Sequence, residues 1–366
     1  MKQPSPFDQQ VPVLLENMFL VNPQLNSIVK GVQSMARRRK LTVRMSSSFD
    51  EVAAWCRRGK VRAAIVLSCS KAEAASLCRR FYEHRVHPVF TNMQPEGCGY
   101  PYSCVMQDYR DACDRIIGEV VSRGAEKIAY VGHNPDSYTD SLRFGELRRG
   151  VQEHRLQCDV YENTGDLRAC IDAFLRRADE YGAVICANDI IAVLLVRRFD
   201  DPESHNIMGF GGMVIGEQIR GFTTAVLDYF GVGSHAVEIF SLLVKEQDIG
   251  NITMTVTSRL AHEAAARPRA VGGGSRSERK RIDFYGDGEV QRTSSLENLL
   301  LNCDDVDRGI LRCLLRGDHY SAIEENNYIS LNTIKYRIGK MIKNAEVADK
   351  AALLDLLRSF DIDFGE

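Results

Sequence analysis

The sequence of 366 residues predicts an α/β fold with two lobes, each a doubly wound parallel sheet, followed by a small all-α domain. Short apolar segments rich in Val, Ile and Ala alternate with amphipathic helical segments from about residue 10 to 264. This alternation is typical of parallel strands covered by helices on both faces. About ten strands are more than one open sheet usually holds, which favours two sheets. From Leu296 onward the apolar spacing is entirely helical.

Each segment of the first unit is assigned from its apolar pattern and its length. The expected strands are 11–16, 41–46, 61–68, 87–92, 127–133, 183–188 and one within 205–212. The expected helices are 22–40, 51–59, 76–86, 111–124, 170–182 and 189–199. Together they form a two-lobed unit over residues 10–264.

Residues 265–295 are expected to form a linker. The stretch 265–281 contains three consecutive glycines, Gly272–Gly274, and many basic residues, and it has neither the strand nor the helix period. The short stretch 282–290 is compatible with a tight hairpin around Gly286-Asp287-Gly288. The last unit is then 296–366. We expect cleavage at Gly272–Gly274 to release two independently folded pieces.

Composition and charge exclude several classes of protein. Apolar residues make up 44% of the chain and charged residues 26%, with a net charge of −2, as in globular rather than disordered proteins. No segment approaches the roughly 20 apolar residues that span a bilayer, and the N-terminus lacks the apolar core of a signal peptide. We therefore expect a cytoplasmic protein without membrane contact. The 11 cysteines form no CxxC pair, which predicts reduced core thiols and no metal site.

The C-terminal unit concentrates its cations on one predicted helix, residues 331–344. That helix contains four Lys or Arg residues and no carboxylate, whereas residues 300–366 as a whole contain more acidic than basic residues. Ser330 is well placed to cap its N-terminus, and a short helix and a turn precede it. Such a helix fits the major groove of DNA. The alternative is an ordinary solvated helix face.

An Ile-Ser-x-x-Thr-Ile-Lys sequence, Ile329 to Lys335, opens this helix. With the segments around it, residues 307–357 resemble the LuxR-type helix-turn-helix. The positions that match are Leu311, Gly317, Ile323, Ile329, Ser330, Thr333, Ile334 and Lys335. Three positions differ, because Glu324 replaces a small Ala, Asn327 replaces a packing Leu, and Arg337 replaces a His.

The resemblance implies which residues contact DNA. Lys335 and Arg337 would contact phosphates and bases, and Arg is well suited to guanine. Lys340 and Lys343 would contact phosphates. Ser330 would cap the helix, and the remaining candidates for base edges or backbone are Asn332, Thr333 and Tyr336. In the last helix Leu353, Leu354 and Leu357 resemble the stripe that pairs protomers in this family, although a core stripe has the same spacing.

Several segments of the first unit also form a pattern. They are an opening strand followed by Asn22-Pro23 and Gly31, then Cys-Ala-Asn-Asp-x-x-Ala at 186–192, and Gly-Phe at 209–210 followed by Thr-Thr at 223–224. Together they resemble the effector domain of LacI/GalR-type regulators, a type I periplasmic-binding-protein fold. The resemblance implies a small ligand between the lobes, bound by Asn22, Asp108, Arg143 and Asn188.

The same resemblance casts doubt on a sugar as the ligand. The family usually has an Asp after Gly-Phe that accepts hydrogen bonds from sugar hydroxyls, and here it is Gly211. We therefore expect a ligand with fewer hydroxyls than a hexose, or an anion that pairs with Arg143. Asp108 and Asn188 have an alternative role as helix N-caps.

No Walker A, GxSxG, HExxH or strand-helix GxGxxG motif is present, so we expect no enzyme activity, no cofactor and no metal. The sequence predicts a DNA-binding transcriptional regulator controlled by a small-molecule effector. One recognition helix covers few base pairs, so we expect a homodimer on double-stranded DNA. The main alternative is a solute-binding protein whose C-terminal helices contact other proteins, and the third is a sugar- or nucleotide-modifying enzyme.

Overall fold

The computed structural model describes residues 10–15, 23–67, 71–95, 97–219, 221–246, 250–261, 287–362 and 364. The strands of the first lobe are β1 (Gln10–Leu15), β2 (Thr42–Ser46), β3 (Ala63–Leu67), β4 (His87–Thr91), β5 (Ser103–Gln107) and β11 (Thr253–Val256). They form a six-stranded sheet in the order β11-β5-β4-β3-β1-β2, and the paired strands are parallel.

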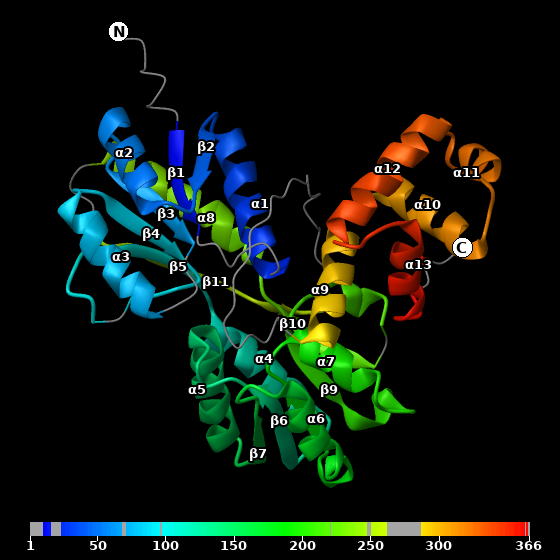
Figure 1. The fold of residues 1–366 in the computed structure, drawn as a ribbon. Coiled ribbons are helices and arrows are strands. Elements are labelled where there is room, and N and C mark those ends of the chain that lie inside the picture. Colours follow the sequence, from blue (N-terminus) through cyan, green and yellow to red (C-terminus); the bar gives the residue numbers. More distant parts are fainter. Residues whose placement is uncertain are drawn as a thin grey trace.

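The second lobe repeats this plan. Its strands are β6 (Lys127–His133), β7 (Gln157–Glu162), β8 (Ala183–Cys186), β9 (Ile207–Gly211), β10 (Phe222–Val226) and β12 (Arg259–Leu260). Their order is β12-β10-β9-β8-β6-β7, and β12 pairs antiparallel to β10. The chain crosses between the sheets after β5, after β10 and after β11. Figure 1 shows the two lobes one above the other. The predicted two-lobed α/β fold is therefore confirmed.

Helices cover both sheets. The first lobe has α1 (Pro23–Arg38), α2 (Phe49–Gly59), α3 (Lys71–Glu83) and α8 (Tyr229–Lys245), and the second has α4 (Tyr109–Ser122), α5 (Tyr138–Glu153), α6 (Leu167–Leu175) and α7 (Asp189–Val196). Helices α1 and α8 pack very closely, because a Cβ atom on Gly31 would lie 2.1 Å from the Phe230 carbonyl oxygen and one on Gly233 would lie 2.0 Å from that of Ile28. A larger residue at either position would force the helices apart.

Five helices follow the second lobe. They are α9 (Gly288–Leu301), α10 (Asp305–Arg316), α11 (Tyr320–Asn327), α12 (Leu331–Asn344) and α13 (Lys350–Arg358). Helix α12 has the predicted bounds, and Gly317 ends α10 with a left-handed φ of 85°. The inward residues of α12, Ile334, Ile338 and Met341, are buried as expected.

The predicted linker is wrong at its C-terminal end. Residues 288–295 belong to α9, so the hairpin expected over 282–290 does not form at 288–290, and 282–286 lie outside the described residues. Helix α9 begins earlier than expected because Asp287 caps it. The Oδ1 atom of Asp287 accepts hydrogen bonds from the backbone N–H groups of Glu289 (2.8 Å) and Val290 (3.1 Å). An Asp before a short polar stretch is a helix N-cap here rather than a turn residue.

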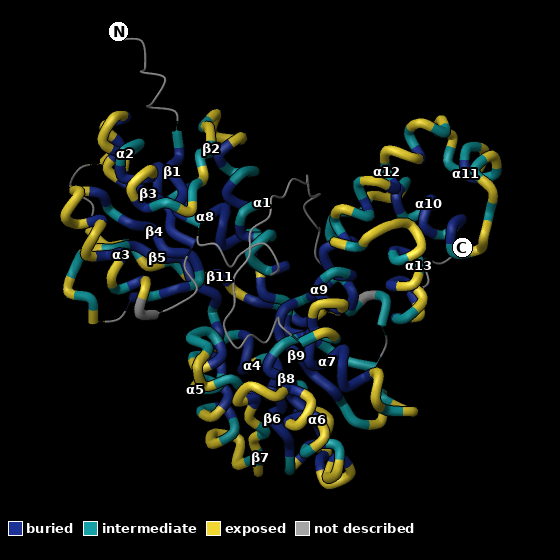
Figure 2. Tube along the Cα trace, in the orientation of Figure 1, coloured by how far each residue is buried: buried dark blue, intermediate teal, exposed yellow. Residues whose placement is uncertain are grey.

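Each lobe has an apolar interior. Figure 2 shows the buried residues of both lobes in dark blue. The ten described cysteines are free thiols, and seven of them are buried. Among the described residues, no helix has the length and apolar character to cross a membrane.

Candidate functional site

Asp189 holds together three segments at one end of the second sheet. It is the first residue of α7 and is fully buried. Its Oδ1 accepts a hydrogen bond from the Thr224 hydroxyl in β10 (2.6 Å), and its Oδ2 accepts one from the Met213 N–H after β9 (2.9 Å). Burial raises the pKa of Asp189 to about 6, against the opposing effect of these hydrogen bonds.

The position of Asp189 gives a structural reason for the glycines in the Gly-Phe-Gly-Gly sequence. A Cβ atom on Gly209 would lie 2.5 Å from Asp189 Oδ1, and one on Gly211 would lie 3.0 Å from Oδ2. Gly211 also has a φ of +148°, which disfavours other residues. An Asp at 211 would therefore clash with the carboxylate that organises this end of the sheet.

Arg143, in α5, is buried within the second lobe. Its Nη2 donates to Asp140 Oδ1 (3.4 Å), which also accepts a hydrogen bond from the Tyr130 hydroxyl (2.8 Å). The guanidinium carbon lies 5.7 Å from the ring centre of Tyr109 and 5.3 Å from that of Phe210. Its Nε has no hydrogen-bond partner among the described residues. Burial raises the pKa of Asp140, but contacts with His133, Arg143 and others outweigh this and lower it.

The other predicted effector residues are helix caps or lie outside the described residues. Asp108 accepts a hydrogen bond from the Asp111 N–H (3.0 Å) and caps α4, and Asn188 accepts one from the Ile191 N–H (3.1 Å) and caps α7. Asn22 lies outside the described residues. No hydrogen bond or ion pair joins Asp108, Arg143 and Asn188 in the described part of the chain, although Arg143 lies against Tyr109, the neighbour of Asp108.

Sequence reasoning missed Gln107, the last residue of β5. Its side chain is buried, and neither the amide oxygen nor the amide nitrogen has a hydrogen-bond partner among the described residues. Its backbone N–H donates to Asn92 Oδ1 (3.5 Å), which also accepts a hydrogen bond from the Tyr109 hydroxyl (3.1 Å). An unpaired buried amide is costly, which makes Gln107 a candidate ligand contact. The signal in the sequence was a polar residue at the end of an apolar strand.

The outer face of α12 presents the predicted DNA-binding residues. Ser330, Asn332, Lys335, Tyr336 and Lys343 are exposed, and the Tyr336 side chain is 74% exposed. Ser330 caps the helix by accepting a hydrogen bond from the Thr333 N–H (3.4 Å). In the described part of the chain, Asn332, Lys335, Tyr336 and Lys343 make no side-chain hydrogen bond or ion pair.

Arg337 is not exposed in the way that the sequence predicted. Its Nη1 donates to both carboxylate oxygens of Asp304 (2.9 Å each) and to Asp307 Oδ1 (2.7 Å). Asp304 and Asp307 form the capping box at the start of α10. Arg337 therefore joins α12 to α10, and Lys340 is only partly exposed. The sequence pattern could not show this, because the carboxylates lie 30 or more positions earlier.

Two departures from the helix-turn-helix pattern have local explanations. Glu324 lies in α11, and its Oε1 accepts a hydrogen bond from the N–H of Leu331, the first residue of α12 (2.5 Å). Glu324 therefore helps to cap the N-terminus of α12. Asn327 donates to the Ile323 carbonyl oxygen (3.0 Å). It packs on Gly309, where a Cβ atom would lie 2.2 Å from Asn327 Oδ1. A polar side chain at 327 is thus matched by a glycine in α10.

The leucine stripe of α13 belongs to the core of the chain. Leu353 and Leu357 are fully buried within this single chain, and Leu354 is half-buried. Of the two possibilities that the sequence left open, the structure favours the core stripe.

Comparison with known proteins agrees with this architecture. Residues 117–260 match the family model described as a periplasmic binding protein-like domain. The complex of the transcriptional regulator CelR with cellobiose is similar in structure, with a TM-score of 0.58, 17% identity, and coverage of 70% of this chain and 84% of that chain. The chain has the type I periplasmic-binding-protein fold.

Further solved structures share this fold. A LacI-family transcriptional regulator from Rhizobium etli has a TM-score of 0.55 at 17% identity, covering 69% of this chain and 96% of that chain. The Lac repressor dimer bound to operator and an anti-inducer has a TM-score of 0.55 at 17% identity, covering 71% and 93%. No curated protein matches the chain.

Proposed function

We propose that this protein is a sequence-specific DNA-binding transcriptional regulator controlled by a small-molecule effector that binds between its lobes. The observation that carries the proposal is the exposed face of α12, a helix that has no carboxylate, where Lys335, Tyr336 and Lys343 make no side-chain hydrogen bond or ion pair to any described residue. The fold, shared with ligand-bound regulators, supports the sensor half.

The proposed DNA contacts divide by role. Lys335, Asn332 and Tyr336 contact base edges or adjacent phosphates, and Lys343 contacts a phosphate. Arg337 acts mainly by holding α12 in place, since its guanidinium already pairs with two carboxylates. The regulator binds DNA as a homodimer, because a second recognition helix doubles the number of base pairs contacted. Because the α13 stripe is buried, its pairing surface lies elsewhere.

The proposed effector has fewer hydroxyl groups than a hexose. Gly211 offers no side-chain acceptor, and Asp108 and Asn188 each already accept a backbone hydrogen bond through Oδ1, which leaves fewer acceptors for ligand hydroxyls. Among the described residues, the Gln107 amide and the Nε of Arg143 are buried polar groups without a hydrogen-bond partner, and the guanidinium carbon of Arg143 lies 5.7 and 5.3 Å from two aromatic ring centres. A flat ligand with one acceptor or an anionic group suits these groups best.

DNA binding is tested by selecting bound fragments from a random duplex library and measuring their affinity by fluorescence anisotropy. Lys335→Ala should weaken binding by about 1–3 kcal/mol if it contacts a base. Lys245→Ala, an exposed helical lysine of the first lobe, is the matched control. If no duplex is enriched, the alternative of a solute-binding protein replaces the proposal.

The effector site is tested by thermal shift with a panel of sugars, nucleosides and small acids, because a ligand that binds only the folded state raises the Tm. Gln107→Met should remove the shift caused by the active compound. Asn188→Ser retains a capping hydroxyl and tests whether the Asn188 amide takes part. If a stabilising compound binds both variants as tightly as the wild type, the effector site lies elsewhere in the protein.

A further inference from the structure

The C-terminal half of α9 is enclosed on every side. From Thr293 to Leu300 every residue except Ser295 is buried. A helix on the surface of a globular protein normally exposes one face. Helix α9 instead packs against α1 of the first lobe, against α7 and the 3₁₀ helix η4 (Val214–Glu217) of the second, and against α12 and α13. In Figure 1 it lies between the second lobe and α12.

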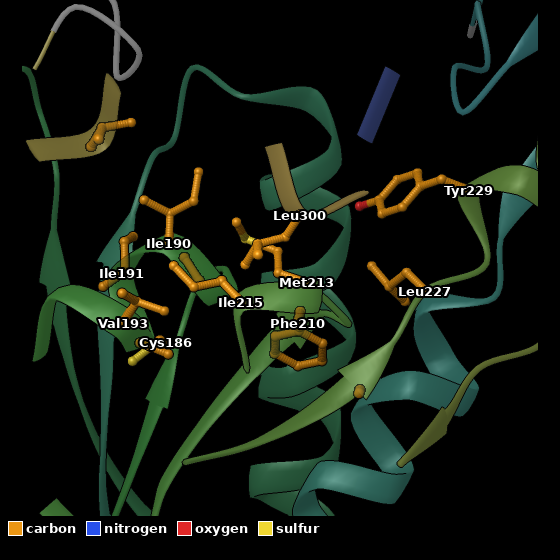
Figure 3. Close-up of a cluster of buried hydrophobic side chains, with 14 of the residues drawn as sticks. Cys186, Ile190, Ile191, Val193, Phe210, Met213, Ile215, Leu227, Tyr229 and Leu300 are labelled. Atoms are coloured by element: carbon orange, nitrogen blue, oxygen red, sulfur yellow. The ribbon is translucent and has the colours of Figure 1, made fainter. Parts of the chain in front are cut away.

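The contact with the second lobe includes a buried carboxylate. Glu297 is 2% exposed, and its two oxygens accept hydrogen bonds from the backbone N–H groups of Val214 and Ile215, each 2.8 Å long. These N–H groups belong to η4, which follows β9 directly. Figure 3 shows Leu300 of α9 beside Met213, the residue before η4, in a cluster of buried hydrophobic side chains. Hydrogen bonds to a buried charge are among the stronger ones in proteins.

The contact with the first lobe is made by amides and an amine. Asn26 Nδ2 donates to Asn298 Oδ1 (3.2 Å), and Lys30 Nζ donates to Asn302 Oδ1 (2.8 Å). Asn26 and Lys30 lie on α1 and are only partly buried. Water can replace such hydrogen bonds at a smaller cost than those of the Glu297 carboxylate.

A second contact joins the second lobe to the last helix. Arg197, at the end of α7, donates from Nη2 to the Ser359 carbonyl oxygen (2.7 Å). Its guanidinium carbon lies 4.3 Å from the ring centre of Phe360. The C-terminal helices are therefore attached to the second lobe through both α9 and the end of α13, and to the first lobe mainly through α9.

We propose that α9 couples the two lobes to α12: it moves with the second lobe, and its contact with α1 of the first lobe is the one that breaks and reforms. The regulatory meaning of this coupling rests on the proposed function, whereas the coupling itself does not. A change in the angle between the lobes must disturb one side of α9, and the weaker polar contacts lie on the α1 side. The position of α12 relative to the first lobe then depends on the state of the lobes.

Hydrogen exchange of the full-length chain, followed by mass spectrometry, tests the coupling without any ligand. Glu297→Gln puts an NH₂ group against a backbone donor, and Lys30→Met removes the amine from the α1 side. Glu289→Gln, on the same helix but with an exposed carboxylate paired to Arg198, is the control. We expect Glu297→Gln to speed exchange about tenfold or more across 288–301 and 331–344. Lys30→Met and Glu289→Gln should leave 331–344 within about twofold of the wild type.

Two results would overturn the coupling. One is faster exchange at Val214 and Ile215 alone in Glu297→Gln, which would make Glu297 only a local cap of η4. The other is equal loosening of α12 in Lys30→Met and Glu297→Gln. If Glu297→Gln does not fold, Glu297→Asp retains the charge and should give a smaller effect in the same segments. Affinity for the selected DNA is measured in parallel. A wild-type chain that binds no DNA overturns the proposed function, while the exchange pattern still decides the coupling.

Discussion

Asp189 shows how one buried side chain organises an end of a sheet. Because the native pKa is about 6 and the usual value is 3.8, the native state binds more protons than the unfolded state between these pH values. The extra proton bound by Asp189 stabilises the native state. This contribution to the free energy of unfolding is complete below about pH 4 and is lost as the pH rises through about 6. Asp189→Asn has no titratable group and should lack that loss. Urea unfolding of both proteins between pH 4 and 7 measures the difference, and parallel stability curves would contradict it.

The asparagine variant is informative because it can keep both hydrogen bonds. Its amide oxygen can accept from the Met213 N–H, and its amide nitrogen can donate to the Thr224 hydroxyl oxygen. Asp189→Ala leaves the buried Met213 N–H without an acceptor. It should therefore lower the free energy of unfolding by about 3 kcal/mol at neutral pH, much more than Asp189→Asn. This comparison separates the effect of charge from the effect of lost hydrogen bonds.

Arg337 and Lys335 should behave differently, although they lie two positions apart on one helix. Arg337→Ala leaves the buried carboxylate of Asp307 without this partner, and should cost about 2 kcal/mol of stability as well as weakening DNA binding. Lys335→Ala should change stability by less than about 0.5 kcal/mol and weaken DNA binding alone. Urea unfolding and anisotropy on the same samples make the test. An unchanged stability in Arg337→Ala would return Arg337 to the role of a direct DNA contact.

At the scale of elements, the contact between α1 and α9 has its own pH dependence. Burial lowers the pKa of Lys30 from 10.5 to about 8; the attraction of Glu297 opposes this shift, and the repulsion of Lys340 adds to it. Between these pH values the unfolded state binds more protons, so the free energy of unfolding gains a term that rises with pH. Lys30→Met should lack this rise between about pH 8 and 10. An identical slope in wild type and variant would show that Lys30 is solvated.

The elements that the sequence predicted are those with a strong local signal. Helix α12 was predicted with its observed bounds, because Ser330 caps it and its apolar residues recur at helical spacing. Strand β5 was not predicted as an element, since its apolar run is short and lies between two polar residues, Ser103 and Gln107, whose side chains are buried by other parts of the same chain. Helix α9 was predicted too short because its cap, Asp287, stands beside glycines that favour a turn.

The candidate sites were predicted less completely than the fold, and for a related reason. Asp108 and Asn188 follow strands, as ligand-binding residues do in such folds; the same position also suits a helix cap, and both residues cap helices in the structure. Glu297 lies in a leucine-rich helical segment, residues 296–301, which was a detectable sign of a buried charge. Its partners, the N–H groups of Val214 and Ile215, are more than 80 positions away, and no local pattern identifies them.

At the scale of the whole molecule, the structure changes the expected result of cutting the chain at Gly272–Gly274. Helix α9 lies on the C-terminal side of that cut, and its residues Leu296, Glu297 and Leu300 are buried. We therefore expect the two pieces to stay together after cleavage at a protease site inserted there, because separation would expose apolar surface and leave a buried carboxylate and two N–H groups unpaired.

Size-exclusion chromatography of the cleaved protein, without denaturant, makes this measurement. The two pieces should elute together, and Glu297→Gln should shift them towards separate peaks at low concentration. Glu289→Gln, which changes only the exposed ion pair between α9 and Arg198 of the second lobe, should elute like the wild type, because such pairs contribute less than about 1 kcal/mol. If the wild-type pieces separate completely, the sensor and the C-terminal helices are independent units, as the sequence alone predicted. In that case α9 is too weakly held to couple the lobes to α12.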